Sequence, residues 1–183
     1  MPDTLVITHA SATLAGLKTG NLFPCPKESK DTLSKSLNRI NRVLVPRGAR
    51  MIPLKTTDRQ TLLYLYRPKR LYRDLQDPLT KKILLAYGYP ADRPEQCVKK
   101  LIARMQAGTE FPHEVGLFLG YPAEDVQGFI AHGAKGAKLV GTWKVYGDAQ
   151  AAEKQFALYR KCTRVYLSAY EKHRSFARLV VNG

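Results

Sequence analysis

The stretch ARMIPLKTTDRQTLLYLYR, residues 49–67, indicates what kind of fold this chain adopts. Two runs, 49–57 and 60–67, are rich in leucine, tyrosine and other residues typical of strands, and they lie around Thr57-Asp58-Arg59. This pattern predicts two strands joined by a tight turn. Proline cannot donate a hydrogen bond to a neighbouring strand, so Pro53 places the first strand at a sheet edge or at a bulge.

Helical patterns surround this pair of strands. Within 30–44 four leucine or isoleucine residues recur at helical spacing, and Ser29 precedes them as an N-cap. Further helices are predicted at 68–76, at 78–87, from Pro94 to Gly108, from Pro122 onward and at 148–172. Extended chain is predicted at 22–26, and strands at 114–120, 139–147 and 176–181. Residues 3–17 are apolar and small, and Gly20-Asn21 is expected to be a helix stop or turn.

This order of elements is mixed rather than strictly alternating. It predicts an α+β fold in which a mainly antiparallel sheet packs with several helices, including a long C-terminal helix. A chain of 183 residues fits one domain of ordinary size, so a single domain over residues 1–183 is expected.

The net charge of +15 is the unusual feature of the composition. Hydrophobic residues make up 44% and charged residues 25% of the chain, which is typical of a globular protein. An excess of 30 lysines and arginines over 15 acidic residues attracts nucleic acid, anionic surfaces and phosphorylated ligands. Because the basic residues are spread along the chain, a generally basic surface without a specific polyanion partner is the alternative.

Cysteine usage and hydropathy indicate the compartment. Cys25, Cys97 and Cys162 lie far apart and are odd in number, which argues against a disulfide framework and fits a reducing cytosol. We expect no signal peptide and no membrane-spanning segment, hence a cytoplasmic protein without a membrane partner. The histidines and cysteines are scattered without metal-ligand spacing, so no metal site is predicted.

The segment FPHEVGLFLGYPAEDVQGFI, residues 111–130, carries the strongest candidates for chemistry. His113-Glu114 lacks the second histidine of a His-Glu-x-x-His zinc motif, because position 117 is leucine. Neighbouring residues also diverge in direction, so they do not readily form a catalytic dyad. Two interpretations of His113 remain: a general acid or base that contacts a ligand, and a core-rim histidine hydrogen-bonded to backbone.

Three other features have both a functional and a structural interpretation. Cys25, between two prolines, is the most exposed candidate for a thiol nucleophile, whereas Cys97 and Cys162 on helices are expected to be buried. HGAKGAK, residues 132–138, could form a phosphate-binding nest or a solvated loop. The two helices within 78–107 could form a helix-turn-helix or an ordinary helix pair.

Three strings of the chain resemble a bacterial and archaeal family filed as domain of unknown function 3793. They are HASATLAGLKTGNLFPC, FPHEVGLFLGYPAEDVQGFI and GTWKVYGDAQAAEKQFALYRKC, and the resemblance runs from about residue 9 to residue 170. It implies a cytosolic prokaryotic protein, without implying an activity. The lysines of AKGAK, residues 134–138, depart from the family's pattern. The matching strings highlight His9, Lys18, Asn21, Cys25, His113, Glu114, Tyr121, Trp143, Lys144, Tyr146 and Cys162.

The first functional hypothesis is a protein that binds an anionic small molecule or a cofactor of unknown kind. Acid/base chemistry would lie at His113, with Glu114 as its neighbour and Cys25 as a thiol at the rim; whether the protein is an enzyme stays open. The ligand-binding residues would be His9, Lys18, Asn21, Tyr121, Trp143, Lys144 and Tyr146, gathered into one pocket. The alternatives are a nucleic-acid-binding or regulatory protein that uses its charge, and a basic adaptor for an acidic protein such as a flavodoxin-like carrier.

Overall fold

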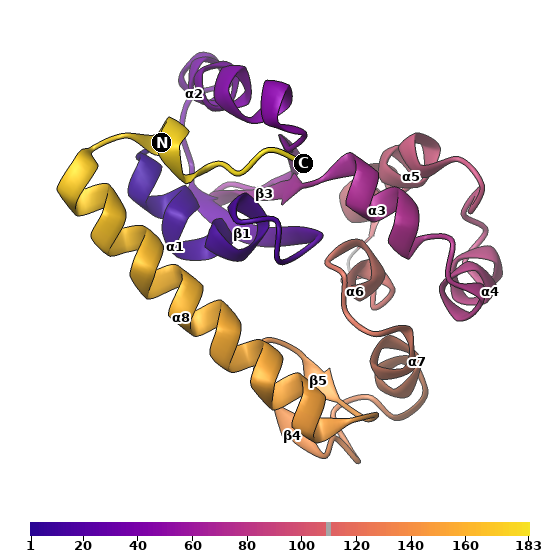
Figure 1. Ribbon diagram of the computed structural model, residues 1–183. Helices are drawn as coiled ribbons and strands as arrows, with labels where there is room; N and C mark the ends of the chain where they lie inside the picture. The colour runs from indigo at the N-terminus through magenta and orange to yellow at the C-terminus, as the bar shows by residue number, and fades with distance from the viewer. Residues whose placement is uncertain (109–110) are drawn as a thin grey trace. The chain divides into compact units, whose positions relative to one another are not determined.

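The structure is a computed structural model, and it describes residues 1–108 and 111–183. It confirms the α+β class (Figure 1), with an antiparallel sheet and a long helix near the C-terminus. The helices are α1 (Asp3–Leu14), α2 (Lys30–Leu44), α3 (Pro68–Asp74), α4 (Pro78–Ala86), α5 (Pro94–Ala107), α6 (Val115–Phe118), α7 (Ala123–His132) and α8 (Ala149–His173), with 3₁₀ turns η1 (Val45–Arg47) and η2 (Phe176–Leu179). The strands are β1 (Gly20–Pro26), β2 (Arg50–Thr56), β3 (Gln60–Tyr66), β4 (Leu139–Val140) and β5 (Lys144–Val145).

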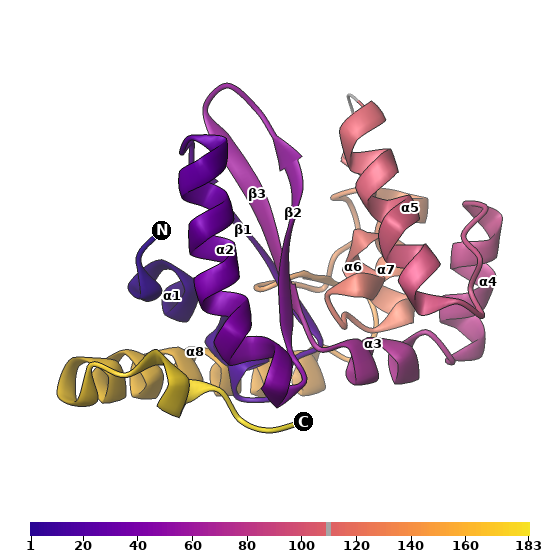
Figure 2. The same ribbon diagram turned by 90° about the horizontal axis from the view of Figure 1, so that it is seen from above.

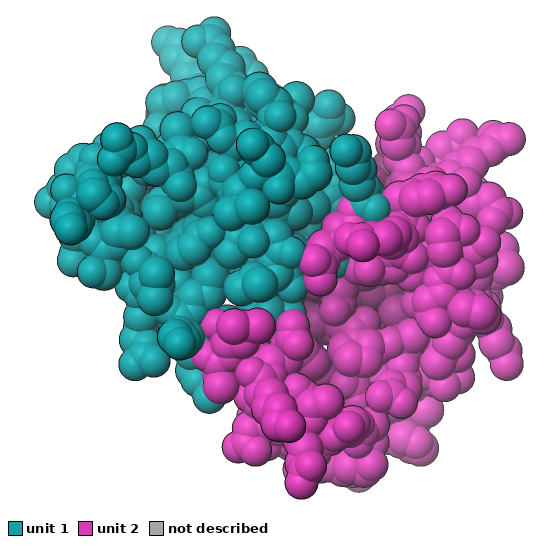
Figure 3. Space-filling view, in the orientation of Figure 1, with its two compact units in different colours: residues 1–69, 159–183 teal, residues 70–158 magenta. Residues whose placement is uncertain are grey.

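The chain divides into two compact units (Figure 3). Unit 1 comprises Met1–Lys69 and Tyr159–Gly183, and unit 2 comprises Arg70–Leu158. Helix α8 therefore begins in unit 2 and ends in unit 1. The expectation that all 183 residues form a single domain stays a prediction.

The sheet of unit 1 contains the predicted strand pair. β3 is its centre and pairs antiparallel with β1 on one side and with β2 on the other. The register of β2 shifts between Pro53 and Lys55, so the proline lies on an edge strand beside a bulge, as predicted.

One face of this sheet carries the core of unit 1. Phe23 and Cys25 from β1, Met51 from β2, and Leu63 and Leu65 from β3 belong to one buried apolar cluster. Helices α1 and α2 and the 3₁₀ turn η2 supply most of the rest of the cluster, and partly buried residues of α8 pack against it. Figure 2 shows α1 and α2 running beside the strands. The amphipathic pattern of α2 follows from this packing, because only Ile40 and Leu44 are fully buried.

A buried arginine connects the ends of several elements in unit 1. Arg67 is 4% exposed, and its guanidinium donates to the carbonyl oxygens of Thr13 and Leu14 at 2.7 Å each, and of Val181 at 2.7 Å. It also donates to the carbonyl of Arg47 at 3.2 Å. The last carbonyls of a helix have no partner within the helix, so Arg67 satisfies the C-terminal end of α1 with a charge-assisted bond.

Unit 2 is built mainly from short helices with recognisable starts. Asp77 caps α4 by accepting from the backbone N–H of Thr80 at 2.8 Å, and Pro94 stands in the first turn of α5. Glu124 and Asp125 lie in the first turn of α7, as the sequence predicts. The buried apolar side chains of these helices include Ile83, Leu84, Cys97, Val98, Leu101, Met105, Leu117, Phe118 and Val126.

Three predicted strands are wrong. Residues 114–120 contain helix α6, because every residue from Val115 to Leu119 is buried and a run apolar on all sides carries no periodicity. Residues 139–147 form a hairpin of two short strands, β4 and β5, rather than one strand. Residues 176–181 begin with η2, and the later Val181 N–H donates a single hydrogen bond to the carbonyl of Leu14.

The predicted helix stop at Gly20-Asn21 is also wrong. Helix α1 ends at Leu14, followed by Gly16 with a φ of 71°, and Gly20 begins strand β1. A left-handed residue after a helix favours glycine, and Gly16 meets that need four residues earlier than expected. Among the described residues, no helix is both long enough and apolar enough to cross a membrane.

Candidate functional site

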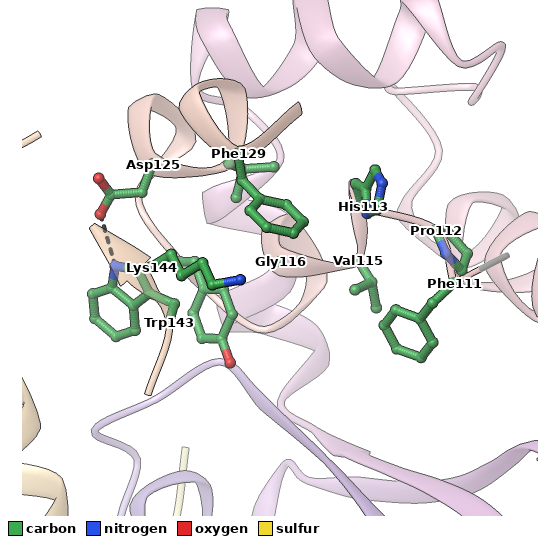
Figure 4. A pocket seen from close by; sticks show the side chains of 11 residues that line it. Phe111, Pro112, His113, Val115, Gly116, Asp125, Phe129, Trp143 and Lys144 are labelled. Atoms are coloured by element: carbon green, nitrogen blue, oxygen red, sulfur yellow. Dashed lines mark hydrogen bonds between the residues drawn. The ribbon is translucent and has the colours of Figure 1, made fainter. Parts of the chain in front are cut away.

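A pocket of about 290 Å³ lies within unit 2 (Figure 4). Three segments line it: the chain from Phe111 into the start of α6, helix α7 with Tyr121 before it, and the first residue of β5 with Trp143 before it. Most of its lining is apolar or aromatic, and Figure 4 shows the rings of Phe111, Phe129 and Trp143 around the space. The polar side chains His113, Asp125 and Lys144 also reach its wall.

The carboxylate of Asp125 holds one wall of this pocket in place. The side chain is 2% exposed; its Oδ2 accepts a hydrogen bond from Trp143 Nε1 at 2.7 Å. Oδ1 accepts from the backbone N–H groups of Tyr146 at 2.7 Å and Gly147 at 2.8 Å. Three donors therefore satisfy a buried charge, and they fix the β4–β5 hairpin against α7. Asp125 is occupied in this way and is a positioning group.

Aromatic stacking completes the same wall. The Trp143 ring stacks on Tyr121 with centroids 4.9 Å apart, and it meets the edge of Phe156 at 4.5 Å. Such pairs add stabilisation beyond the area that they bury. Trp143 is 9% exposed, so its indole is mainly a core side chain with one side toward the pocket.

The two groups that can carry positive charge flank the ring of Phe129. Lys144 Nζ lies 5.0 Å from the Phe129 centroid, and the His113 ring meets Phe129 edge-on at 4.9 Å. Figure 4 shows both side chains on the pocket side of their segments. His113 is exposed and Lys144 is half-buried, so both are accessible to a ligand.

Two glycines let the elements around the pocket approach closely. A Cβ on Gly116 would lie 2.8 Å from Val126 and 3.0 Å from the ring of Tyr121. A Cβ on Gly128 would lie 2.4 Å from the ring of Tyr146. Any larger residue at either position would push α6 or the β4–β5 hairpin away from α7.

A family model described as Protein of unknown function (DUF3793) matches residues 6–180. The chain belongs to the DUF3793 family. No curated protein and no solved structure matches this chain. The family resemblance of the three strings is thereby confirmed, and it covers both compact units.

The pocket brings together four of the residues predicted in this DUF3793 protein: His113, Tyr121, Trp143 and Lys144. Tyr146 packs against Gly128 instead, and its hydroxyl donates to the carbonyl of Gly133. His113 is exposed and its ring packs at right angles to Phe129, so the choice between a ligand contact and a residue at the rim of the core stays open.

Glu114 points away from this pocket. It is 0% exposed, and its Oε1 accepts from the Tyr89 hydroxyl at 2.8 Å and lies 2.8 Å from Nε of Arg104. Burial and the neighbouring carboxylate raise the pKa of Tyr89, so the phenol stays protonated and donates. His113 and Glu114 therefore face different surroundings, as expected for adjacent residues.

The remaining predicted residues of the DUF3793 protein belong to unit 1. Cys25 is 1% exposed, which corrects the expectation of an exposed thiol, and burial raises its pKa. Its side chain belongs to the sheet face that packs on the helices. His9 stacks on Phe23 at 5.5 Å, and Asn21 accepts from the Thr13 hydroxyl at 2.7 Å. Lys18 is 3% exposed. That residues of both units share one pocket stays a prediction.

The other two cysteines match their prediction. Cys97 and Cys162 are buried on α5 and α8, and burial raises the pKa of both thiols. All three cysteines are free. In the described part of the chain, no three histidine, cysteine or acidic side chains gather as a metal site would require.

Sequence reasoning missed the residues that give the site its shape. Phe129 is the ring that both Lys144 and His113 contact, and Asp125 had only a helix-start role in the sequence. Arg104 and Tyr89 were not singled out as partners of Glu114. Arg104 lies 10 residues and Tyr89 lies 25 residues before Glu114 in the sequence, and hydrophobic periodicity does not predict contacts over such separations.

Proposed function

We propose that unit 2 of this DUF3793 protein binds a small anionic molecule with an aromatic or similarly flat apolar body. One observation carries the proposal: Lys144 and His113, from distant segments, lie against the same ring in a mostly apolar pocket, whose carboxylate, Asp125, is already held by three donors. A cation held beside apolar walls favours a ligand whose anionic group reaches the cation while its body leaves water.

The pocket also limits the ligand's size. Its volume of about 290 Å³ lies at the lower end of the range usual for small-molecule sites, roughly 300–1,000 Å³. A single aromatic ring with a carboxylate or phosphate group suits such a space. His113 lines the same pocket, so its ring nitrogens are also within the reach of a bound ligand.

Binding of phenyl phosphate tests the proposal. Trp143 is the single tryptophan of the chain and lines the pocket, so its fluorescence should change saturably as the probe binds. The variant Lys144→Gln should bind about tenfold more weakly, because a charge-assisted hydrogen bond contributes roughly 1.5–3 kcal/mol. His113→Gln should also weaken binding, because it removes the imidazole from the pocket wall.

The matched control is Lys135→Gln, which removes the same charge from an exposed position outside the pocket. It should leave the affinity within about twofold, since exposed charges act weakly at a distance in salt. Benzyl alcohol, which lacks the anion, should bind more weakly than phenyl phosphate to the unaltered protein. Equal losses in Lys144→Gln and Lys135→Gln would contradict the proposal.

A second candidate function rests on the charge of unit 1. This unit holds 18 of the 30 lysines and arginines and 5 of the 15 acidic residues, a net +13, whereas unit 2 carries +2. Within it Arg160, Lys161 and Arg164 are exposed on successive turns of α8. Such a concentration supports binding of a polyanion, with nucleic acid as the first choice and an acidic protein as the alternative.

A further inference from the structure

A second cavity of about 450 Å³ lies within unit 2, beside the first pocket. The two share Phe111, Pro112 and His113, but the second has a different character. Its wall includes the polar side chains of Tyr87, Arg104 and Glu114, together with the end of α5. Charged side chains therefore line this cavity, whereas aromatic rings make up much of the lining of the first pocket.

Glu114, which lines this cavity, has a carboxylate oxygen without a hydrogen-bond partner among the described residues. Glu114 has 1% of its side chain exposed, and both contacts described for it reach Oε1. Oε2 is buried and, within the described residues, accepts no hydrogen bond. A buried carboxylate oxygen is normally hydrogen-bonded, because burial removes it from water without compensation. Within the described residues this oxygen therefore keeps the capacity to accept one more hydrogen bond.

The arginine beside it is held in position. The guanidinium carbon of Arg104 lies 5.3 Å from the centroid of Tyr87 and 5.9 Å from that of Tyr89. Its Nε faces Glu114 at 2.8 Å, an ion pair in which Nε has no acceptor in hydrogen-bond geometry. Among the described contacts its terminal nitrogens donate to no acceptor either, so they are available to a ligand in the cavity.

We propose that this cavity binds a carboxamide, with its N–H donating to Glu114 Oε2 and its carbonyl accepting from Arg104. Glu114 and Arg104 already neutralise each other, so an uncharged ligand leaves no unpaired charge in the cavity. A carboxamide carries a hydrogen-bond donor and an acceptor side by side. This arrangement complements the acceptor oxygen of Glu114 and the donor nitrogens of Arg104. Tyr87 adds a flat surface for a ring attached to the amide.

Benzamide is the probe that tests this proposal. The backbone amides of Ala107 and Gly108 line the cavity, and their NMR signals should shift saturably with benzamide up to about 20 mM. N,N-dimethylbenzamide lacks the N–H, and benzoate replaces it with a second anionic oxygen. Both should bind at least about fivefold more weakly. Glu114→Gln, which removes the acceptor oxygens' charge, should weaken benzamide binding by a similar factor.

A pair of alanine variants keeps the test decisive if Glu114→Gln fails to fold. Ala107→Phe fills the cavity and should abolish the shifts, whereas Ala103→Phe, one turn earlier on α5 and outside the cavity, should not. Equal affinity for benzamide and its dimethyl form, or binding unchanged by Ala107→Phe, would overturn the proposal. Phenyl phosphate binding followed at Trp143 reports the first pocket, so the two proposals can fail separately.

Discussion

Lys18 is a buried residue whose pKa lies far from its ordinary value. Burial lowers the pKa of its amine from 10.5 to about 7, and its Nζ lies 6.0 Å from the ring centroid of Tyr159. A charged amine loses hydration on burial, and a distant ring face replaces only part of it. Folding therefore favours the neutral amine at this position.

This shift predicts that Lys18 makes stability rise with pH. Between about pH 7 and about pH 10 the unfolded chain binds a proton at Lys18 that the folded chain has released. The free energy of unfolding should rise by about 1.5 kcal/mol between about pH 7 and about pH 8.5, relative to Lys18→Met. Urea unfolding of both proteins measures the difference, in which all other titrating groups cancel. If the free energy of unfolding changed with pH in the same way in both proteins, the pKa of Lys18 would not be lowered by folding.

The β4–β5 hairpin shows how one side chain positions an element. Its strands are two residues long, which is too short for independent stability. The carboxylate of Asp125 on α7 accepts three hydrogen bonds from the hairpin and its following turn. The wall of the first pocket therefore depends on α7 more than on strand pairing.

Asp125→Asn should loosen this element. An amide keeps one acceptor oxygen but places an NH₂ group against N–H donors, so the unfolding free energy should fall by about 2 kcal/mol. The fluorescence of Trp143 should shift toward that of an exposed indole, and phenyl phosphate should bind more weakly. Asp148→Asn is the comparison variant, because this carboxylate also lies near the hairpin but accepts from the Ala151 N–H. If Asp125→Asn left the fluorescence spectrum unchanged, Asp125 would not be the group that holds the β4–β5 hairpin against α7.

At the same scale, elements with local start signals were predictable. Ser29 accepts from the backbone N–H of Thr32 at 3.2 Å and begins α2 where the sequence places it. Proline likewise stands in the first turn of α4 and α5. The strands predicted at 114–120 and 176–181 failed because short apolar runs are ambiguous, and burial on all sides in α6 removes the alternation that identifies a strand.

For the whole molecule, the dominant feature is the unequal charge of its two units. Unit 1 carries +13 of the net +15, although the basic residues look evenly spread along the sequence. The segment 159–183, which begins within α8, belongs to unit 1 and adds six basic residues against one acid. The concentration therefore arises from which segments fold together.

This distribution predicts polyanion binding that depends on unit 1. Fluorescence anisotropy with a labelled single-stranded RNA and DNA should show affinity that falls steeply with salt, by about 0.7 log units per log unit of salt for each neutralised phosphate. Combined replacement of Arg160, Lys161 and Arg164 by glutamine should weaken binding about tenfold or more. The same replacement of Lys82, Arg93 and Lys99, exposed in unit 2, should change it little.

Equal losses in the two triple variants would assign the binding to net charge alone. If the anisotropy of neither labelled nucleic acid rises at low salt, nucleic-acid binding is ruled out as a function of this protein. Polyglutamate in the same assay separates an acidic protein partner from nucleic acid, because it offers carboxylates without phosphates.

By itself, the sequence determined the α+β class, the hairpin at 49–67, the capped helices and the family, because these depend on local periodicity, on turn residues or on strings of residues. It also identified His113 and Lys144 as candidates. Only the tertiary structure placed both against Phe129, buried Cys25, and turned Glu114 toward Tyr89 and Arg104. Those relations join residues far apart in the chain, and they are fixed by packing of helices whose relative positions no local pattern encodes.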